Sequence, residues 1–142
     1  MIWWNTIFGK RIYMNSIIIV NYNGEEFTRS FLESLRVVSP VVEYEIIVVD
    51  NCSTDGSNEI IQSEYPEVLP IQQDRNEGFG NANNVGACSV RGEYLFIINN
   101  DTLFTQDALT PLSQFLETDK TIGIAAPMLL HQDGSFQHAN RS

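Results

Sequence analysis

Four polar segments of the chain carry side chains that can hold a small polar ligand. Each segment follows an apolar run, and each combines Asn or Asp with Gly or hydroxyl residues. These residue types also make turns and helix caps, so one such segment alone indicates only a loop. Four of them in one chain favour a polar ligand site. The segments are residues 21–24, 50–56, 76–84 and 99–102.

The residues in these segments suit the parts of a nucleotide. Tyr22 offers a flat ring and a hydroxyl for a base, and Asp50 can accept two hydrogen bonds from a planar N–H edge or a ribose diol. Gly78 lets the backbone approach a ligand just before a helix N-terminus, which favours negative charge. Asp101 and Asn99 offer hard oxygen ligands for Mg²⁺ or Mn²⁺ bound to a diphosphate.

The charge balance argues against nucleic acid as a partner. Asp and Glu total 18 against 8 Lys and Arg, a formal net charge of −10, and the two lysines are Lys10 and Lys120. A nucleic-acid binder held by phosphate contacts needs a basic face. An anionic ligand must therefore meet backbone N–H groups or a metal ion, which supplies the missing positive charge.

The length and composition are typical of one folded domain: 142 residues, 43% hydrophobic and 18% charged. Three apolar runs without polar alternation, at residues 16–20, 45–49 and 94–98, predict strands buried on both faces of a parallel sheet. Residues 122–126 predict a weaker fourth strand, and residues 68–71 predict a short edge strand.

Apolar residues at helical spacing lie between these strands. Asn23 followed by Glu26 predicts a capping box at the start of the first helix. The alternation predicts a doubly wound α/β sheet, in which ligands bind beyond the carboxyl ends of the strands. The helical patterns cover residues 27–35, 60–61, 79–86 and 109–116.

Several well-known site patterns do not fit. Gly78 and Gly80 are followed by Asn83 where a dinucleotide fingerprint needs a third glycine, and the pattern comes late in the chain. The phosphate-binding loop of nucleotide triphosphatases has no counterpart here. A phosphoacceptor role for Asp50 would need a lysine at the end of a later strand. A Ser-His-Asp hydrolase would need a nucleophile elbow, which the sequence lacks.

The first 15 residues predict an N-terminal extension. It is apolar and then basic, the reverse of a secretory signal, and a peripheral membrane contact through it is one hypothesis. The two cysteines, Cys52 and Cys88, form no disulfide scaffold and suggest a reducing compartment, so we expect a cytoplasmic location, with the inner face of the membrane as an alternative. The residues that would contact the membrane are Trp3, Trp4, Ile7, Phe8, Lys10 and Arg11.

The four segments in this order resemble family 2 glycosyltransferases. The resemblance begins at Ser16 and runs through the Asn21-Tyr-Asn-Gly, Asp50-Asn-Cys-Ser-Thr-Asp-Gly and Asn76-Glu-Gly segments. It ends with Asn-Asn-Asp-Thr at residues 99–102, a form most similar to the rhamnosyltransferase-type branch. The resemblance implies a GT-A fold, which is a Rossmann-like three-layer α/β/α arrangement with a mostly parallel sheet. It also implies that residues 16–142 form the nucleotide-sugar-binding part, truncated before the acceptor-binding half.

The resemblance assigns roles to individual residues. Tyr22 and its neighbours would border the base, Asp50 would bond the base edge, and Asp101 with Asn99 would hold Mg²⁺ or Mn²⁺ and the diphosphate. Two departures concern charge: Asn99 replaces an acidic residue, and Asn83 stands where many relatives carry Arg. The residues assigned to the nucleotide-sugar are Asn21, Tyr22, Asn23, Asp50, Asn51, Asn76, Gly78, Asn83, Asn99 and Asn100.

The catalytic residue implied by the family is not found. An inverting transferase needs a carboxylate base, which in the family lies in the downstream half that also carries the acceptor site. The later acidic residues have the setting of ordinary surface groups, so the catalytic residue is unknown. They are Asp107, Glu117, Asp119 and Asp133.

Two functions of different classes follow from these observations. The first is an inverting glycosyltransferase that moves sugar from a UDP-, dTDP- or GDP-sugar to a saccharide or lipid-linked acceptor, in cell-surface polysaccharide synthesis. The second is a truncated, non-catalytic module that binds nucleotide or serves in assembly. An apolar edge left by a missing half would favour a homo-oligomer.

Overall fold

The computed structural model describes residues 6–7, 10–11, 14–131 and 133–137. Two short strands, β1 (Thr6–Ile7) and β2 (Lys10–Arg11), pair antiparallel in the N-terminal segment. Three of the six residues expected to contact a membrane, Trp3, Trp4 and Phe8, lie outside the described residues. The membrane contact therefore stays a prediction.

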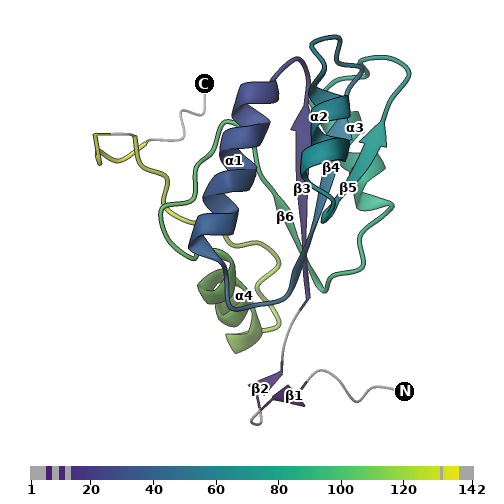
Figure 1. Ribbon diagram of the computed structural model, residues 1–142. Helices are drawn as coiled ribbons and strands as arrows, with labels where there is room; N and C mark the ends of the chain where they lie inside the picture. Colours follow the sequence, from purple (N-terminus) through teal and green to yellow (C-terminus); the bar gives the residue numbers. More distant parts are fainter. Residues whose placement is uncertain (1–5, 8–9, 12–13, 132, 138–142) are drawn as a thin grey trace.

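A four-stranded parallel sheet forms the centre of the protein (Figure 1). Its strands are β3 (Asn15–Asn21), β4 (Tyr44–Asp50), β5 (Val68–Gln72) and β6 (Tyr94–Ile97). They lie in the order β5-β4-β3-β6, and every neighbouring pair is parallel. This confirms the parallel sheet expected from the apolar runs, with the segment around Pro70 at one edge. The burial on both faces expected for residues 94–98 is wrong, because β6 is the other edge strand and Leu95 and Ile97 are 42% and 54% exposed.

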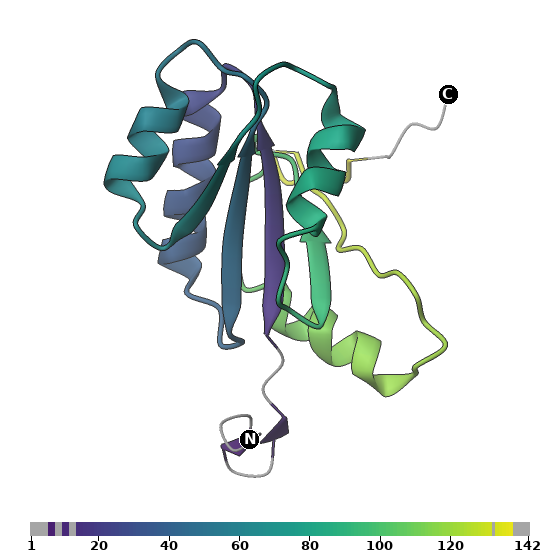
Figure 2. The same ribbon diagram turned by 90° about the vertical axis from the view of Figure 1, so that its right-hand side faces the viewer.

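Four helices cover the sheet from both sides, so the protein has three layers (Figure 2). They are α1 (Glu25–Val38), α2 (Ser57–Glu64), α3 (Phe79–Ala87) and α4 (Leu109–Thr118). Helices α1 and α2 lie on one face, and α3 lies on the other. Among the described residues, no helix is long and apolar enough to span a bilayer.

The core is divided by the sheet into two clusters. Ile17 and Ile19 of β3 face α1 and α2, while Ile18, between them in sequence, faces α3. Strand β4 divides in the same way, because successive side chains of a strand point to opposite faces. An unbroken apolar run is therefore what a strand covered on both faces requires.

The weaker fourth strand expected at residues 122–126 does not form. This segment is irregular, and Ile124 is 89% exposed. Three of its five residues are Gly or Ala, which are poor strand formers, and no described strand pairs with it. The chain continues into a small hairpin closed by a bridge between Leu130 and Phe136.

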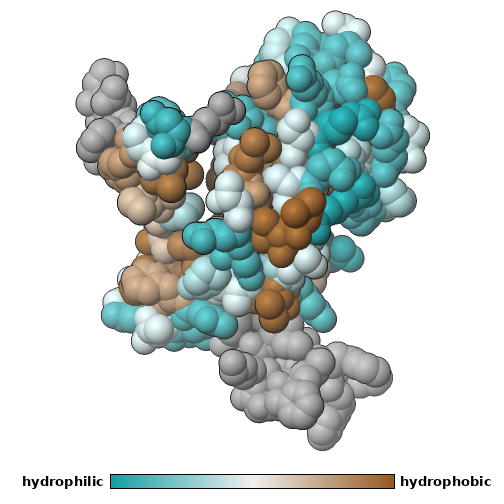
Figure 3. Space-filling view, turned by 60° about the vertical axis from the view of Figure 1, so that its left-hand side comes forward, coloured by the Kyte–Doolittle hydropathy of each residue, from teal (hydrophilic) through white to brown (hydrophobic). Residues whose placement is uncertain are grey.

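Exposed apolar side chains gather on this last segment. Apolar surface shows on the hairpin in the space-filling view (Figure 3). Its members are 48–89% exposed. This surface is compatible with association, and the expected homo-oligomer stays a prediction. The residues are Ile124, Met128, Leu129, Leu130 and Phe136.

A buried carboxylate joins the amino ends of the central strands. Glu45 is 8% exposed and accepts hydrogen bonds from Ser16 Oγ at 2.6 Å and from the backbone N–H and guanidinium of Arg91 at 2.6 and 2.7 Å. Burial raises the pKa of Glu45, but these hydrogen bonds and the Arg91 charge lower it more. The pKa therefore lies below its ordinary value of 4.5, and Glu45 is ionised at neutral pH.

We expect Glu45→Gln to lower the free energy of unfolding by about 1–3 kcal/mol at pH 7, because it removes a buried charged acceptor. The carboxylate stabilises the fold fully above its unfolded-state pKa, and this stabilisation is lost as the pH falls through the lower folded-state value. The difference between wild type and variant in urea unfolding should therefore shrink below about pH 4.5. Glu43→Gln, at an exposed position, is the control; equal losses in both variants would contradict the assignment.

Helix α3 approaches the sheet at a glycine. A methyl group placed on Gly86 would lie 2.9 Å from Ile18 Cγ2 and 3.1 Å from Val49 Cγ2. In the same helix, a methyl group on Gly80 would meet nothing within 4 Å. Of the two glycines in α3, only Gly86 lies where close packing against the sheet leaves no room for a methyl group.

We expect Gly86→Ala to destabilise the protein by about 1–3 kcal/mol through overpacking. Gly80→Ala should be neutral or stabilising by up to about 1 kcal/mol, because alanine is the better helix former. Thermal or urea unfolding of both variants measures the contrast. Similar changes in the two variants would show that α3 does not pack this closely.

Candidate functional site

A buried amide at the end of the central strand forms the floor of the site. Asn21 is fully buried, and its Nδ2 donates to Asp50 Oδ1 at 3.0 Å and to Ser53 Oγ at 3.1 Å. Its Oδ1 accepts from Thr28 Oγ1 at 2.9 Å and from Asn100 Nδ2 at 3.4 Å. Asp50 Oδ2 in turn accepts the backbone N–H of Ser53 at 3.0 Å. One side chain thus ties together the loops that follow β3, β4 and β6.

The next residue of the β4 loop makes a second junction. Asn51 is 2% exposed, and its Nδ2 donates to Asn76 Oδ1 at 2.7 Å. Its Oδ1 accepts from Gln73 Nε2 at 3.2 Å and from the backbone N–H of Glu77 at 3.1 Å. Asn76 Oδ1 also accepts the N–H of Gly78 at 2.9 Å. Asn51 therefore holds the loop that leads into α3.

The loops after β3 and β4 are also joined by hydrogen bonds between backbone N–H groups and side-chain oxygens. The N–H of Asn23 donates to Ser53 Oγ at 2.9 Å, and Asn23 Oδ1 accepts the N–H of Thr54 at 2.8 Å. The N–H of Glu25 donates to Asp55 Oδ2 at 3.2 Å. These contacts join two segments about 30 residues apart in the sequence.

The expected capping box of Asn23 and Glu26 does not form. Helix α1 begins at Glu25, and its N-cap, Gly24, makes no side-chain capping bond. Asn23 has a φ of 49°, in the left-handed region, and its side chain turns to the backbone of Thr54 instead. The hydrogen bond from Thr54 to the Asn23 side chain thus takes the place of the expected capping bond at the start of α1.

Asp55 carries a full negative charge beside the start of α1. Burial raises its pKa, but hydrogen bonds from the hydroxyl and N–H of Ser57 and from the N–H of Glu25 lower it more. The pKa therefore lies below its ordinary value of 3.8. A carboxylate at this place complements the free N–H groups and the dipole of the helix N-terminus.

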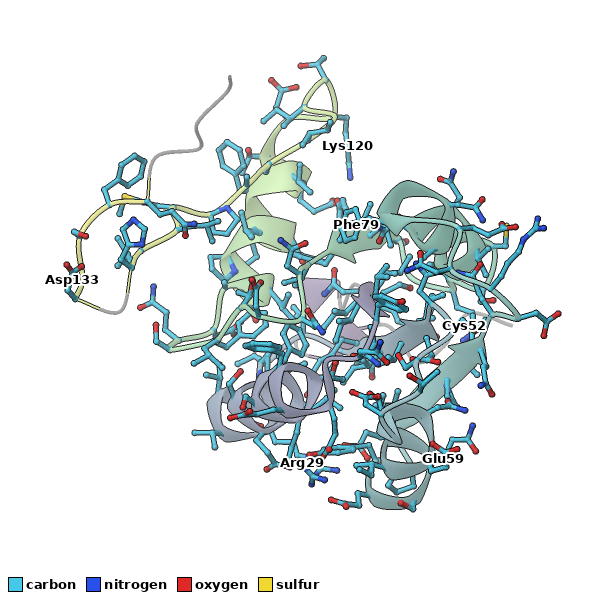
Figure 4. All side chains as sticks on the ribbon, turned by 90° about the horizontal axis from the view of Figure 1, so that it is seen from above. Arg29, Cys52, Glu59, Phe79, Lys120 and Asp133 are labelled. Carbon is cyan, nitrogen blue, oxygen red and sulfur yellow. The ribbon has the colours of Figure 1, made fainter. Side chains whose placement is uncertain are left out.

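A cleft of about 390 Å³ lies over this polar layer. It contains six of the residues predicted from the sequence, namely Tyr22, Asn23, Asn51, Asn76, Gly78 and Asn100, while the buried Asn21 and Asp50 are not among its lining residues. Figure 4 looks down on this end of the sheet, where Phe79 and Cys52 mark α3 and the loop after β4. The lining residues are Val20, Tyr22, Asn23, Gly24, Phe27, Asn51, Asn76, Gly78, Phe79 and Asn100.

Two aromatic residues of the cleft were not predicted as site residues. Phe27 and Phe79 were predicted only as part of the apolar patterns of their helices, and they are 57% and 51% exposed. Both lie in the first turn of a helix that follows a polar segment. That position is a usable signal, because the first turn of such a helix points towards the edge where ligands bind.

Asn83 is buried within α3 at 7% exposure, and it does not line the cleft. Its Nδ2 donates to the carbonyl of Phe79 at 2.9 Å. Its Oδ1 is buried and has no hydrogen-bond partner within the part of the chain that the structure describes. Such an acceptor is rare in a folded protein and is ready to receive a donor.

Asn99 and Asp101 follow β6 and are both exposed, outside the residues that line the cleft. Asn100, between them, turns inwards to Asn21 and to Thr28 Oγ1 at 3.2 Å. Over the described ranges, no three His, Cys, Asp or Glu side chains come together as a metal cluster. Asn99 and Asp101 are thus two exposed oxygen donors outside any such cluster, and the metal site stays a prediction.

Comparison with known proteins identifies the family of this chain. Glycosyl transferase family 2 matches residues 16–142. The chain belongs to glycosyl transferase family 2. The match begins one residue after the start of β3 and includes all the loops around the cleft.

Two relatives carry names that refer to poly(ribitol-phosphate) and to teichoic acid. TarS of Staphylococcus aureus, a poly(ribitol-phosphate) beta-N-acetylglucosaminyltransferase, is 29% identical over 107 residues, 72% of this chain and 18% of TarS. GgaA of Bacillus subtilis, a minor teichoic acid biosynthesis protein, is 31% identical over 119 residues, 79% of this chain and 27% of GgaA. This chain thus spans about a fifth to a quarter of the length of these relatives.

Solved structures share the fold. The crystal structure of TarS residues 1–349 with UDP superposes with a TM-score of 0.66 at 27% identity, covering 74% of this chain and 32% of that one. The mannosyltransferase PcManGT of Pyrobaculum calidifontis, in complex with GDP-Man and Mn²⁺, gives a TM-score of 0.72 at 24% identity, covering 79% and 34%. These matches confirm the GT-A fold of this family 2 chain.

We expect Asn51→Ala to loosen the loop that leads into α3, because it leaves the N–H of Glu77 and the amide of Gln73 without their acceptor. The local cost should be about 1–3 kcal/mol. Hydrogen exchange of residues 73–78 should accelerate, while exchange in β3 stays slow. Asn84→Ala, at an exposed position of α3, is the control. Unchanged exchange at Glu77 and Gly78 in Asn51→Ala would contradict this role.

Proposed function

We propose that this chain provides the donor-binding part of an inverting glycosyltransferase. The observation that carries the proposal is the cleft at the carboxyl ends of the parallel strands, lined by Tyr22, Asn51, Asn76 and Gly78 in a family 2 chain. TarS, which matches this part of the fold, has been crystallised with UDP and with UDP-GlcNAc. The ligand proposed here is accordingly a nucleotide-diphospho-sugar carrying UDP, dTDP or GDP.

The base is proposed to lie against the ring of Tyr22, a residue that lines the cleft and is 53% exposed. Asn51 and Asn76 offer amide groups beside it, although each already has a partner within the protein. Asp50 is 1% exposed, with one hydrogen bond on each carboxylate oxygen, so spare lone pairs remain. A base edge would reach Asp50 only if the loop above it moves.

The diphosphate is proposed to meet the segment after β6 together with Mg²⁺ or Mn²⁺. Asp101 and Asn99 supply two exposed oxygens, which fits a metal held by one or two protein ligands and by the phosphates. When bound, the metal would neutralise the diphosphate charge, which a chain of net charge −10 does little to balance. PcManGT, a protein of the same fold, is described in complex with Mn²⁺.

In the proposed reaction, an acceptor hydroxyl attacks the anomeric carbon, the bond to the diphosphate breaks, and the nucleoside diphosphate leaves. A carboxylate base takes the hydroxyl proton. Asp107 accepts the N–H of Thr110, and Asp119 and Asp133 accept those of Thr121 and Ser135, so these three cap turns or helix ends. Glu117 accepts from the hydroxyl of Tyr94 and forms an ion pair with Lys120, so none of the four later carboxylates is proposed as the base.

The finer assignments rest on similarity, except the membrane location, which rests on the N-terminal extension. A rhamnosyl or other hexosyl donor, a saccharide or lipid-linked acceptor, and a role in cell-surface polysaccharide synthesis at the inner face of the membrane all belong to this proposal. The names of TarS and GgaA support the polysaccharide role. A non-catalytic nucleotide-binding or assembly module is the second candidate, and the exposed apolar residues after α4 favour it.

We expect calorimetric titration to show metal-dependent binding of UDP, dTDP or GDP. Asp101→Asn should weaken this binding about tenfold or more in the presence of Mn²⁺, because a charged ligand of the metal is lost. Without metal, wild type and variant should bind alike. Asp133→Asn is the control, since Asp133 lies at the tip of the C-terminal hairpin, far from Phe79 (Figure 4).

Absence of binding for all three nucleotides would contradict the donor site. Equal affinity of wild type and Asp101→Asn with Mn²⁺ would contradict the metal assignment alone. Release of sugar from the bound nucleotide-sugar above the uncatalysed rate would contradict the non-catalytic module.

A further inference from the structure

We infer that Ser53 is a positioning residue that fixes Tyr22 in the cleft. The inference rests on the proposed nucleotide site and extends it to a residue that does not line the cleft. Ser53 Oγ accepts Asn21 Nδ2 at 3.1 Å and the backbone N–H of Asn23 at 2.9 Å. Asn21 and Asn23, the two residues that flank Tyr22 in the chain, therefore donate hydrogen bonds to the same oxygen atom, Ser53 Oγ.

These two hydrogen bonds explain why a hydroxyl residue suits position 53. A serine oxygen has two acceptor lone pairs, and Asn21 and Asn23 take both of them. Ser53 is itself fixed by its N–H, which donates to the buried Asp50 at 3.0 Å. Ser53 Oγ is therefore held in a fixed position relative to β4. The hydrogen bonds that it accepts fix the position of the loop after β3.

Tyr22 depends on this loop for its position. Among the described residues, nothing hydrogen-bonds to its side chain, and the residue is 53% exposed. The next residue, Asn23, has a φ of 49°, in the left-handed region. This conformation costs a non-glycine residue free energy, so it persists where surrounding contacts hold it. The hydrogen bonds of Asn23 to Ser53 and Thr54 impose this conformation, and so hold the backbone that carries Tyr22 at the cleft.

The test is a double-mutant cycle on nucleotide affinity. We expect Ser53→Ala to weaken binding of whichever of UDP, dTDP or GDP the wild type binds by about threefold to tenfold, the size of one aromatic contact. Tyr22→Ala should weaken it at least as much, and the double variant no more than Tyr22→Ala alone, because Ser53 acts through Tyr22. Ser53→Thr, which keeps the acceptor oxygen, should restore affinity. Additive losses would overturn the inference.

Further measurements separate positioning from general instability. Inorganic pyrophosphate with Mn²⁺ should bind Ser53→Ala and wild type with the same affinity, because pyrophosphate has no base that could contact Tyr22. Amide exchange of Asn23 should accelerate about tenfold or more in Ser53→Ala, because its acceptor is gone. It should stay unchanged in Ser63→Ala, whose hydroxyl bonds the carbonyl of Ile60 in α2. Weaker pyrophosphate binding or unchanged exchange at Asn23 would overturn the inference.

The outcomes for the two proposals are distinct. If the wild type binds none of the three nucleotides, the donor-site proposal fails, and the exchange of Asn23 alone decides whether Ser53 holds the loop. If nucleotide binds and Ser53→Ala has full affinity, the donor site stands and the positioning role of Ser53 is wrong.

Discussion

The buried amide of Asn21 is the constraint on which the site depends. A fully buried Asn must find partners for both its N–H₂ and its carbonyl, since an unpaired group costs about 1–3 kcal/mol. Its partners come from the loop after β4, from α1 and from the loop after β6. The demand for hydrogen bonds at one position therefore brings together three segments that would otherwise be free to vary. Gly24 leaves room for this arrangement, because a methyl group there would lie 2.9 Å from Asn100 Nδ2.

The two ends of the sheet have different roles: one stabilises the fold and the other carries the cleft. At the amino ends of the strands, Glu45 is enclosed by hydrogen bonds and an ion pair with Arg91, an arrangement that stabilises the fold. At the carboxyl ends, a layer of buried polar side chains hydrogen-bonded to one another lies below an open cleft. Between them, β3 and β4 are covered by apolar contacts on both faces. A rigid central sheet is what allows loops at its edge to hold side chains in fixed places.

Most of the fold could be predicted because its signals are local. The runs that became β3, β4 and β6 and the spacing that became α1 and α3 are readable within ten or so residues. The errors arose where long-range contacts decided. Residues 122–126 look like a weak strand but lack a pairing partner, and Asn23 looks like a helix cap but bonds to Thr54, 31 residues away. Phe27 has core spacing in α1, yet it lines the cleft.

The order of strands and helices, the polar segments after the strands and the membership of glycosyl transferase family 2 all follow from residue types and spacing. Those properties belong to short stretches of chain, so the sequence determines them directly. Only the folded structure decides that Tyr22 and Asn76 line the cleft while Asn21 and Asp50 lie buried. The reason is that side-chain direction depends on partners such as Asn21 and Asp50, 29 positions apart, which meet only when the sheet forms.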